Sequence, residues 1–139
     1  MAFNYERRVS FSDTDAMGVV HHAKYLHYLE EARVEWMRAR GLGHTHFPHS
    51  DRVLALLRYQ VWHIKPAFFD DLLRVDLEVQ GLKLKIHFQY AIYSGDTLIA
   101  KAETLHIPVD KDLKPVRPSP ALLKTLENEA WTETWLSNW

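Results

Sequence analysis

One long helical stretch stands among segments typical of β-strands, and this contrast constrains the fold more than any other feature of the chain. In residues 23–40, apolar side chains recur at the spacing of an amphipathic helix. Gly41 and Gly43 follow, and glycine just past the last turn is typical of a helix end. Because no other helix of this length is indicated in the first hundred residues, the strands must pack around this one.

The segments around the helix alternate apolar and polar side chains or are rich in β-branched and aromatic residues, as strands are. We expect five strands, at residues 3–11, 52–64, 72–80, 82–94 and 97–109, with turns at Gly81 and at Gly95-Asp96. The order of strand, loop, long helix, four strands and short helix predicts an α+β fold. In this fold an antiparallel sheet wraps around one central helix.

The C-terminal part of the chain predicts a second, short helix at about residues 119–137, after a proline-rich stretch. Trp131, Trp135 and Trp139 recur every four residues, so on a continuing helix they form one apolar stripe. The stripe packs against the core or contacts another subunit. Because no repeat or linker is present, we expect residues 1–139 to form a single domain.

The composition limits the chemistry that the chain can perform. Cysteine is absent, which excludes disulfide bonds, thiolate nucleophiles and metal sites built on cysteine. The net charge of -1 indicates no basic surface for nucleic acid. The longest aliphatic run, residues 53–57, is too short to span a membrane, and the N-terminus lacks a secretory signal. We therefore expect a cytoplasmic protein without a membrane span or a nucleic-acid partner.

The segment between the first strand and the long helix gathers groups that could carry chemistry. Residues 13–25 read DTDAMGVVHHAKY and bring together two carboxylates, a glycine and two histidines. A helix N-terminus presents backbone N–H groups without partners, which could stabilise an oxyanion. A carboxylate in the preceding loop could attack a carbonyl or activate water. Asp13 and Asp15 have a second interpretation as residues that only shape the turn.

This segment, together with YLEEAR at residues 28–33, resembles the signature of hot-dog-fold acyl-CoA thioesterases. The resemblance is to the 4-hydroxybenzoyl-CoA thioesterase family and its bacterial branch associated with the Tol–Pal gene cluster. Further matches at residues 65–72 and 109–118 extend it over about residues 5–120. It implies a hot-dog fold and a hydrolase that acts on an acyl-CoA substrate without cofactor or metal. It also implies a homodimer or homotetramer with active sites at the subunit interface.

The resemblance implies roles for individual residues of the loop. Asp15 stands where the family keeps its catalytic carboxylate, which acts as nucleophile or as general base toward water. His22 stands at the start of the helix, where the family polarises the thioester carbonyl with a backbone N–H and the bacterial branch adds a histidine side chain. By the same resemblance, the substrate-binding residues are Gly18, Val19 and Tyr25.

The chain departs from the bacterial branch at Phe11, four residues before Asp15, where that branch often carries a tyrosine. The missing hydroxyl leaves open an alternative function, a non-catalytic acyl-CoA or acyl-carrier binding module of the same fold. A hot-dog dehydratase is a further alternative. It is disfavoured because that chemistry normally takes its histidine and its acid from different chains.

The remaining histidines have less specific interpretations. His44, His46 and His49 could hold a metal ion, but they follow the helix end with only Asp51 as a nearby carboxylate, so we expect no metal there. The others are expected in polar or satisfied core positions, namely His27, His63, His87 and His106.

Several charged residues are expected on the surface. Glu30 and Glu31 are interpreted as a solvated helix face or as partners of Arg33. Four cations are expected on exposed strand faces or in contact with a CoA phosphate, namely Arg58, Lys65, Lys83 and Lys85.

Overall fold

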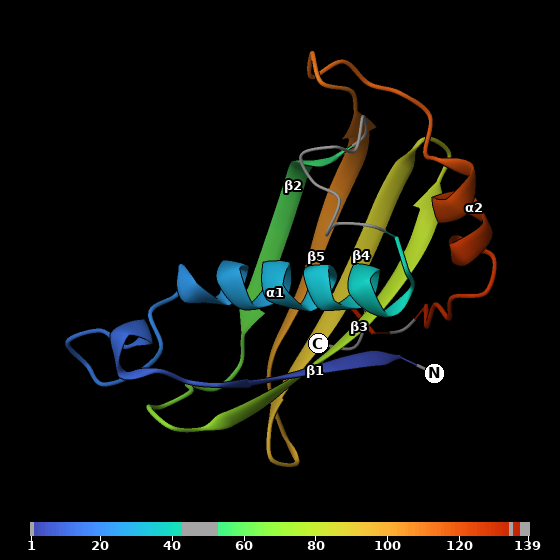
Figure 1. Cartoon of the computed structure of the whole chain (residues 1–139). Helices are drawn as coiled ribbons and strands as arrows, with labels where there is room; N and C mark the ends of the chain where they lie inside the picture. Colours follow the sequence, from blue (N-terminus) through green and yellow to red (C-terminus); the bar gives the residue numbers. More distant parts are fainter. Residues whose placement is uncertain (1, 43–52, 134, 137–139) are drawn as a thin grey trace.

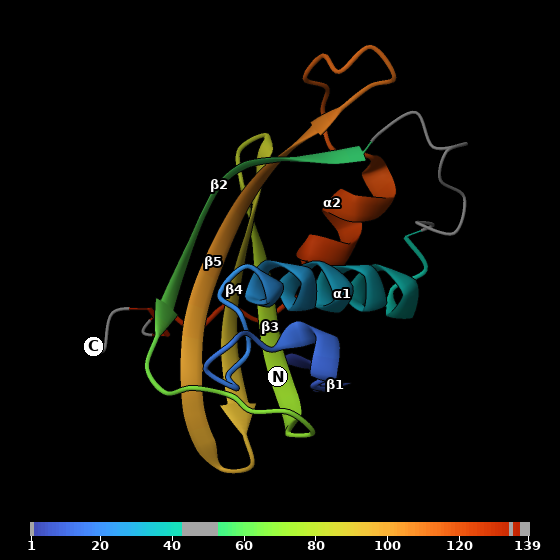
Figure 2. The same ribbon diagram turned by 90° about the vertical axis from the view of Figure 1, so that its left-hand side faces the viewer.

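Helix α1 (Lys24–Ala39) lies across the concave face of an antiparallel sheet, as Figures 1 and 2 show from two directions. The computed structural model describes residues 2–42, 53–133, 135 and 136. Their sheet has five strands, β1 (Phe3–Arg8), β2 (Val53–His63), β3 (Leu72–Leu82), β4 (Lys85–Ser94) and β5 (Thr97–Val109). A second helix, α2 (Pro120–Leu126), packs beside β3. The expected α+β architecture, one sheet around one long helix, is confirmed.

The strand order places β1 and β2 at the two edges of the sheet. The order is β1-β3-β4-β5-β2, and all neighbouring strands are antiparallel. β2 pairs with β5 on one side, and its other edge faces no strand among the described residues. Pairing of His63 with Ala100 brings the end of β2 beside the beginning of β5. The segment after His63 therefore leaves the sheet at the end where β4 turns into β5.

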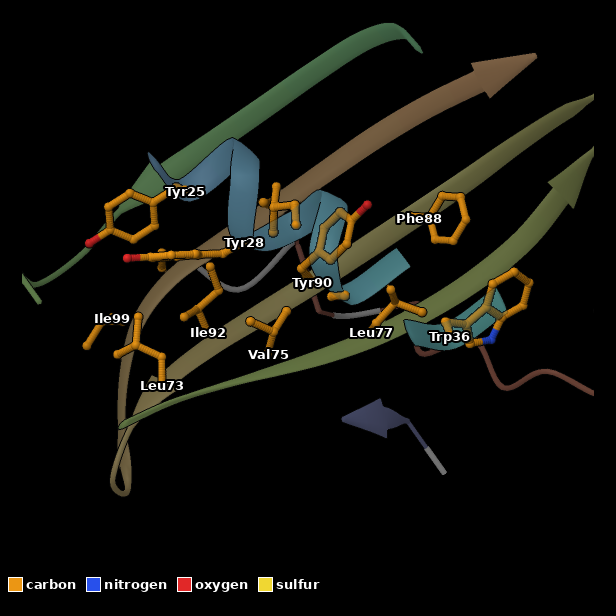
Figure 3. Packing of buried hydrophobic residues seen from close by; sticks show 14 of the residues in the cluster. Tyr25, Tyr28, Trp36, Leu73, Val75, Leu77, Phe88, Tyr90, Ile92 and Ile99 are labelled. Atoms are coloured by element: carbon orange, nitrogen blue, oxygen red, sulfur yellow. The ribbon is translucent and has the colours of Figure 1, made fainter. Parts of the chain in front are cut away.

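The hydrophobic core lies between α1 and the sheet, as Figure 3 shows. α1 buries the residues that recur at helical spacing, Tyr25, Tyr28, Leu29, Ala32 and Trp36. They belong to one cluster with alternate residues of β3, Leu73, Val75, Leu77 and Val79. Removal of this apolar surface from water holds α1 against the sheet, so the N-terminal end of the helix has a fixed place.

The first strand is shorter than predicted. It ends at Arg8 rather than at residue 11, because Ser10 begins a short 3-10 helix, η1 (Phe11–Asp13). The backbone N–H of Ser10 donates a hydrogen bond to the Asp13 carboxylate at 3.0 Å. The acid that was interpreted as a turn former thus ends the strand.

One of the two predicted turns is wrong. Gly81 belongs to β3 and pairs with Ile86 of β4. The chain turns at Lys83 instead, whose φ of 58° lies in the left-handed region. The turn predicted at Gly95-Asp96 is confirmed, since β4 ends at Ser94 and β5 begins at Thr97.

The predicted C-terminal helix ends early. α2 begins after Ser119, whose Oγ accepts a hydrogen bond from the Leu122 N–H at 3.2 Å, and it ends at Leu126. The chain then crosses to β3, where the Thr132 N–H donates to Glu78 Oε1 at 2.6 Å. Trp131 therefore does not belong to a helical stripe, and Trp139 lies outside the described residues. Neither α1 nor α2 combines the length and apolar character that a membrane-spanning helix needs.

Candidate active site

The segment between η1 and α1 folds into a small hairpin. The His21 N–H donates to the Asp13 carbonyl at 2.8 Å, and the Asp15 N–H donates to the Val19 carbonyl at 2.9 Å. The hairpin turns at Gly18, whose N–H donates to the Asp15 carbonyl at 2.9 Å and whose φ is 81°. A side chain at this φ is strained, which explains the glycine. In Figure 1 this hairpin precedes the N-terminal end of α1.

The Asp15 side chain has two functions in the hairpin. Its Oδ1 accepts a hydrogen bond from the Met17 N–H at 2.8 Å, so the interpretation of Asp15 as a turn former is correct. The side chain also lines a pocket. Its second oxygen, Oδ2, accepts no hydrogen bond from the described residues. One carboxylate oxygen thus holds the side chain in place while the other is available to react.

The pocket has a volume of about 340 Å³ and lies between the hairpin and the segment that follows β2. One wall comes from the hairpin and the first turn of α1, with Asp15, Met17, Val19, Val20, His22 and Tyr25. The other wall comes from the end of β2 and the next residues, His63, Ile64, Lys65 and Pro66. Four of the five predicted site residues therefore line one pocket. Gly18 does not line it and serves the turn instead.

The N-terminal end of α1 opens into the same pocket through His22. The Ala23 N–H donates to His21 Nδ1 at 3.1 Å, and the Lys24 N–H donates to the His21 carbonyl at 2.9 Å. The His22 N–H has no acceptor among the described residues. Its exposed ring stacks on His21 with 4.1 Å between the centroids. A backbone donor at the positive end of a helix is suited to a developing negative charge.

His63 was expected in a polar or satisfied core position, and the structure places it at the pocket. It is the last residue of β2, is exposed, and lines the pocket. Its ring meets the Tyr25 ring edge to face, with 4.6 Å between the centroids. Partial burial and the neighbouring His22 lower the pKa of His63, which favours the uncharged imidazole. The segment after β2 is joined to the hairpin, where the Val20 N–H donates to the Ala67 carbonyl at 2.8 Å and Val19 bridges to Phe68. These distant contacts bring His63 to the loop, so no local signal could have found it.

Tyr25 forms the buried part of the pocket wall. It is nearly inaccessible to solvent, and burial raises the pKa of its hydroxyl, as does the Asp71 carboxylate, against the opposing effect of a hydrogen bond with the Ala67 backbone. Tyr25 therefore keeps its proton near neutral pH.

The other residues singled out in the sequence have the following surroundings. Glu31 accepts a hydrogen bond from the Tyr5 hydroxyl at 2.8 Å and does not pair with Arg33, which donates to the Tyr90 hydroxyl at 3.0 Å. Phe11 is exposed and packs on Phe69, with 5.8 Å between the ring centroids. No group of three metal-ligating side chains occurs within residues 2–42 and 53–133. The three histidines considered for a metal lie outside the described residues, namely His44, His46 and His49.

The chain matches the family model of the Thioesterase-like superfamily over residues 9–126. This range contains the hairpin, α1, every lining residue of the pocket and four of the five strands. The match confirms the resemblance that the loop motif indicated.

Two similar proteins and one solved structure agree with the family model. The acyl-CoA thioester hydrolase YbgC of Escherichia coli is 33% identical over 128 residues, which cover 87% of this chain and 89% of that protein. The 1,4-dihydroxy-2-naphthoyl-CoA hydrolase of Thermosynechococcus vestitus is 31% identical over 134 residues, covering 91% of this chain and 92% of that protein. The crystal structure of a 1,4-dihydroxy-2-naphthoyl-CoA thioesterase from Synechocystis matches with a TM-score of 0.83 and 26% identity, covering 92% of this chain and 97% of that one.

The matches extend over nearly the whole chain, and they include both the sheet and the segment that forms the pocket. They favour a catalytic function over a non-catalytic binding module, because the similar proteins are hydrolases by name. The chain is a hot-dog-fold member of the Thioesterase-like superfamily, a thioester hydrolase.

Proposed function

We propose that this thioesterase hydrolyses acyl-CoA, with Asp15 as the nucleophile or general base and the His22 backbone N–H as the oxyanion donor. The observation that carries the proposal is that one pocket receives both a carboxylate with an unpaired oxygen and the N-terminal end of α1. The similar proteins named for acyl-CoA and 1,4-dihydroxy-2-naphthoyl-CoA hydrolysis support a CoA thioester as the substrate.

The reaction needs little more than these two groups. In the general-base form, Asp15 takes a proton from water, the water oxygen bonds to the acyl carbon, and the carbon–sulfur bond breaks. The proton on Asp15 then passes to the leaving thiolate, which leaves the acid and the CoA thiol. In the nucleophilic form, Asp15 attacks the acyl carbon itself and the carbon–sulfur bond breaks to release the CoA thiolate, which takes up a proton from the solvent. Water then hydrolyses the mixed anhydride, which gives the acid and restores the Asp15 carboxylate. A thiolate leaves readily, so a strong acid catalyst is not required. Loss of one oxyanion donor in other hydrolases lowers turnover by about 10²–10³.

Lys65 is proposed as a contact for an anionic group of CoA. It lines the pocket, is exposed and forms no ion pair with the described residues. Lys83 and Lys85 lie at the β3–β4 turn, at the opposite end of β4 from the pocket, so they are poorly placed for a substrate contact. Of the cations considered from the sequence, Lys65 is the one at the pocket. An ammonium group at this point suits a phosphate.

The proposed enzyme is a cytoplasmic homodimer or homotetramer whose subunits join their sheets through β2. β2 is a long edge strand that exposes large apolar side chains, Leu56, Leu57 and Tyr59. An unpaired edge of this kind is prone to pair with another chain. Because β2 ends at His63, a partner along this edge would adjoin the pocket. Light scattering of the purified protein distinguishes monomer, dimer and tetramer, and a monomer at assay concentration would contradict this proposal.

The test of the catalytic proposal is thiol release from short, long and aromatic CoA thioesters by the wild type and Asp15→Asn. The amide keeps the size of the side chain but removes the charge, so kcat/KM should fall at least about 100-fold with an unchanged unfolding temperature. Asp110→Asn is the matched control. Asp110 Oδ1 also accepts backbone hydrogen bonds in a turn, from Asp112 at 2.8 Å and Lys114 at 3.0 Å, but it does not line the pocket. Activity of Asp15→Asn within a few-fold of Asp110→Asn would contradict the proposal.

A further inference from the structure

We infer that Asp13 and Tyr28 are positioning residues that hold the Asp15 hairpin against α1 and thereby determine the turnover rate. The inference rests on the proposed function, since it gives these residues a role in the reaction assigned to Asp15. Neither of them lines the pocket, so they act through the residues that do.

Asp13 connects three parts of the site from a buried position. Its side chain is only 5% exposed, and Oδ2 accepts hydrogen bonds from the Tyr28 hydroxyl at 2.7 Å and from the Ser10 N–H at 3.0 Å. Its carbonyl oxygen accepts the His21 N–H at 2.8 Å. Asp13 thus joins α1, the end of β1 and both strands of the hairpin, two residues before Asp15.

Tyr28 connects this acid to the pocket wall. It is fully buried on α1, one turn after Tyr25, and the centroids of the two rings are 6.0 Å apart. Figure 3 shows the two rings near each other with both hydroxyl groups pointing in the same direction. The hydrogen bond between Tyr28 and Asp13 therefore links α1, whose N-terminal end supplies the His22 N–H, to the hairpin that carries Asp15.

The charge of Asp13 is balanced inside the fold. Arg7 Nη2 lies 3.5 Å from Asp13 Oδ2. Arg7 also forms an ion pair with Glu31, in which Nε lies 3.1 Å from Oε1 but does not have the geometry of a hydrogen bond. Burial opposes ionisation of Asp13, but the Tyr28 and Ser10 hydrogen bonds and Arg7 outweigh it and hold the pKa of the carboxyl below its usual value. Asp13 therefore stays charged at neutral pH. Charge-assisted hydrogen bonds of this kind are short and directional.

Loss of the hydrogen bond between the Tyr28 hydroxyl and Asp13 Oδ2 should lower turnover rather than substrate affinity. Asp15 must reach the acyl carbon while the helix end binds the oxyanion, so the two groups need a fixed separation. Displacement of a reacting group by about 1 Å costs about 100-fold in rate. Removal of a residue that orients a functional side chain in metal sites typically costs about 10–100-fold. The acyl and CoA contacts of the pocket are left in place, so KM should change little.

The test compares Tyr28→Phe with Tyr90→Phe in the thiol-release assay. Tyr90 is the matched control because it is also fully buried and its hydroxyl is also hydrogen-bonded, to Thr104 at 2.6 Å and Arg33 at 3.0 Å, away from the hairpin. Both variants lose one buried hydroxyl group, so similar losses of unfolding temperature are expected. Tyr28→Phe should lower kcat about 10-fold or more at nearly constant KM, whereas Tyr90→Phe should stay within about twofold of the wild type. Equal kcat in the two variants would overturn the inference.

Hydrogen exchange of the His21 and Asp15 amides separates this inference from the proposed function. Both amides bond across the hairpin, so they should exchange faster in Tyr28→Phe than in Tyr90→Phe. Asp15→Asn is assayed in parallel. If the wild type releases no thiol or Asp15→Asn remains active, the proposed function fails, and exchange alone decides whether Tyr28 holds the hairpin. Equal exchange in the two tyrosine variants would overturn the inference even in an active enzyme.

Discussion

Two turns of the chain share three hydrogen bonds, but only one of the turns lies at the pocket. In residues 15–19 and 110–114, the first aspartate accepts through Oδ1 from the N–H two residues later, at 2.8 Å in both turns. Its carbonyl accepts from the N–H three residues later, and its own N–H donates to the carbonyl four residues later, each at 2.9 Å in both turns. The fourth residue has a positive φ in each, 81° at Gly18 and 62° at Leu113.

The difference between the turns lies in their surroundings. The first turn is joined to α1 through Asp13 and lines a pocket with His22. The second lies at the end of β5, where Val109 bridges to Pro115, and none of its residues lines the pocket. A carboxylate in such a turn is therefore no evidence of catalysis by itself. The turn-forming and catalytic interpretations of Asp15 are compatible, because each uses a different carboxylate oxygen.

The largest effect expected from this comparison is at the residue with positive φ. Gly18→Ala places a side chain at a φ of 81°, which should lower the free energy of unfolding by about 1–2 kcal/mol. The strain falls next to Asp15, so kcat should also decrease, by about 10-fold. Chemical denaturation and thiol-release kinetics measure the two effects.

Gly95→Ala is the control for strain alone. Gly95 has a φ of 60°, and an added Cβ would meet no atom within 4 Å, as at Gly18, but Gly95 lies in the β4–β5 turn outside the pocket wall. We expect the same loss of stability with kcat unchanged. A loss of kcat in Gly95→Ala as large as in Gly18→Ala would show that general destabilisation, and not the position of Asp15, limits turnover.

The same contrast between local and distant contacts explains how much could be predicted from the sequence. The long helix and the five strands follow from local periodicity, and the loop motif singled out Asp15, His22 and Tyr25, which line the pocket. Two findings depend on contacts between distant residues. His63 reaches the pocket because the hairpin is joined to the segment after β2, and the hydrogen bonds of Thr132 to Glu78 compete with continuation of the C-terminal helix. Such contacts leave no periodic pattern in the chain.

An effect of intermediate size, on KM, is expected from substitution of the lysine at the pocket, compared with a lysine of the second turn. If Lys65 binds an anionic group of CoA, Lys65→Met should raise KM about 10-fold and leave kcat nearly unchanged, since one charge-assisted hydrogen bond contributes about 1.5 kcal/mol. Lys114→Met is the control, because Lys114 is an exposed lysine of the second turn and does not line the pocket. Steady-state kinetics on one CoA thioester measure both variants. A KM that is equal in the two variants would rule out the phosphate contact.

The smallest effect is expected where the second turn has a side chain in place of glycine. Leu113 has a φ of 62° and is 75% exposed, so Leu113→Gly relieves backbone strain and loses little packing. The relief of about 1 kcal/mol is partly offset by the greater freedom of glycine in the unfolded chain, which leaves a gain of about 0.5 kcal/mol in the free energy of unfolding. Leu113→Ala keeps the Cβ and should change nothing. Chemical denaturation of the two variants separates strain from side-chain loss. Equal stabilities would mean that the second turn tolerates the left-handed conformation without cost, which would also contradict the loss of stability expected in Gly18→Ala.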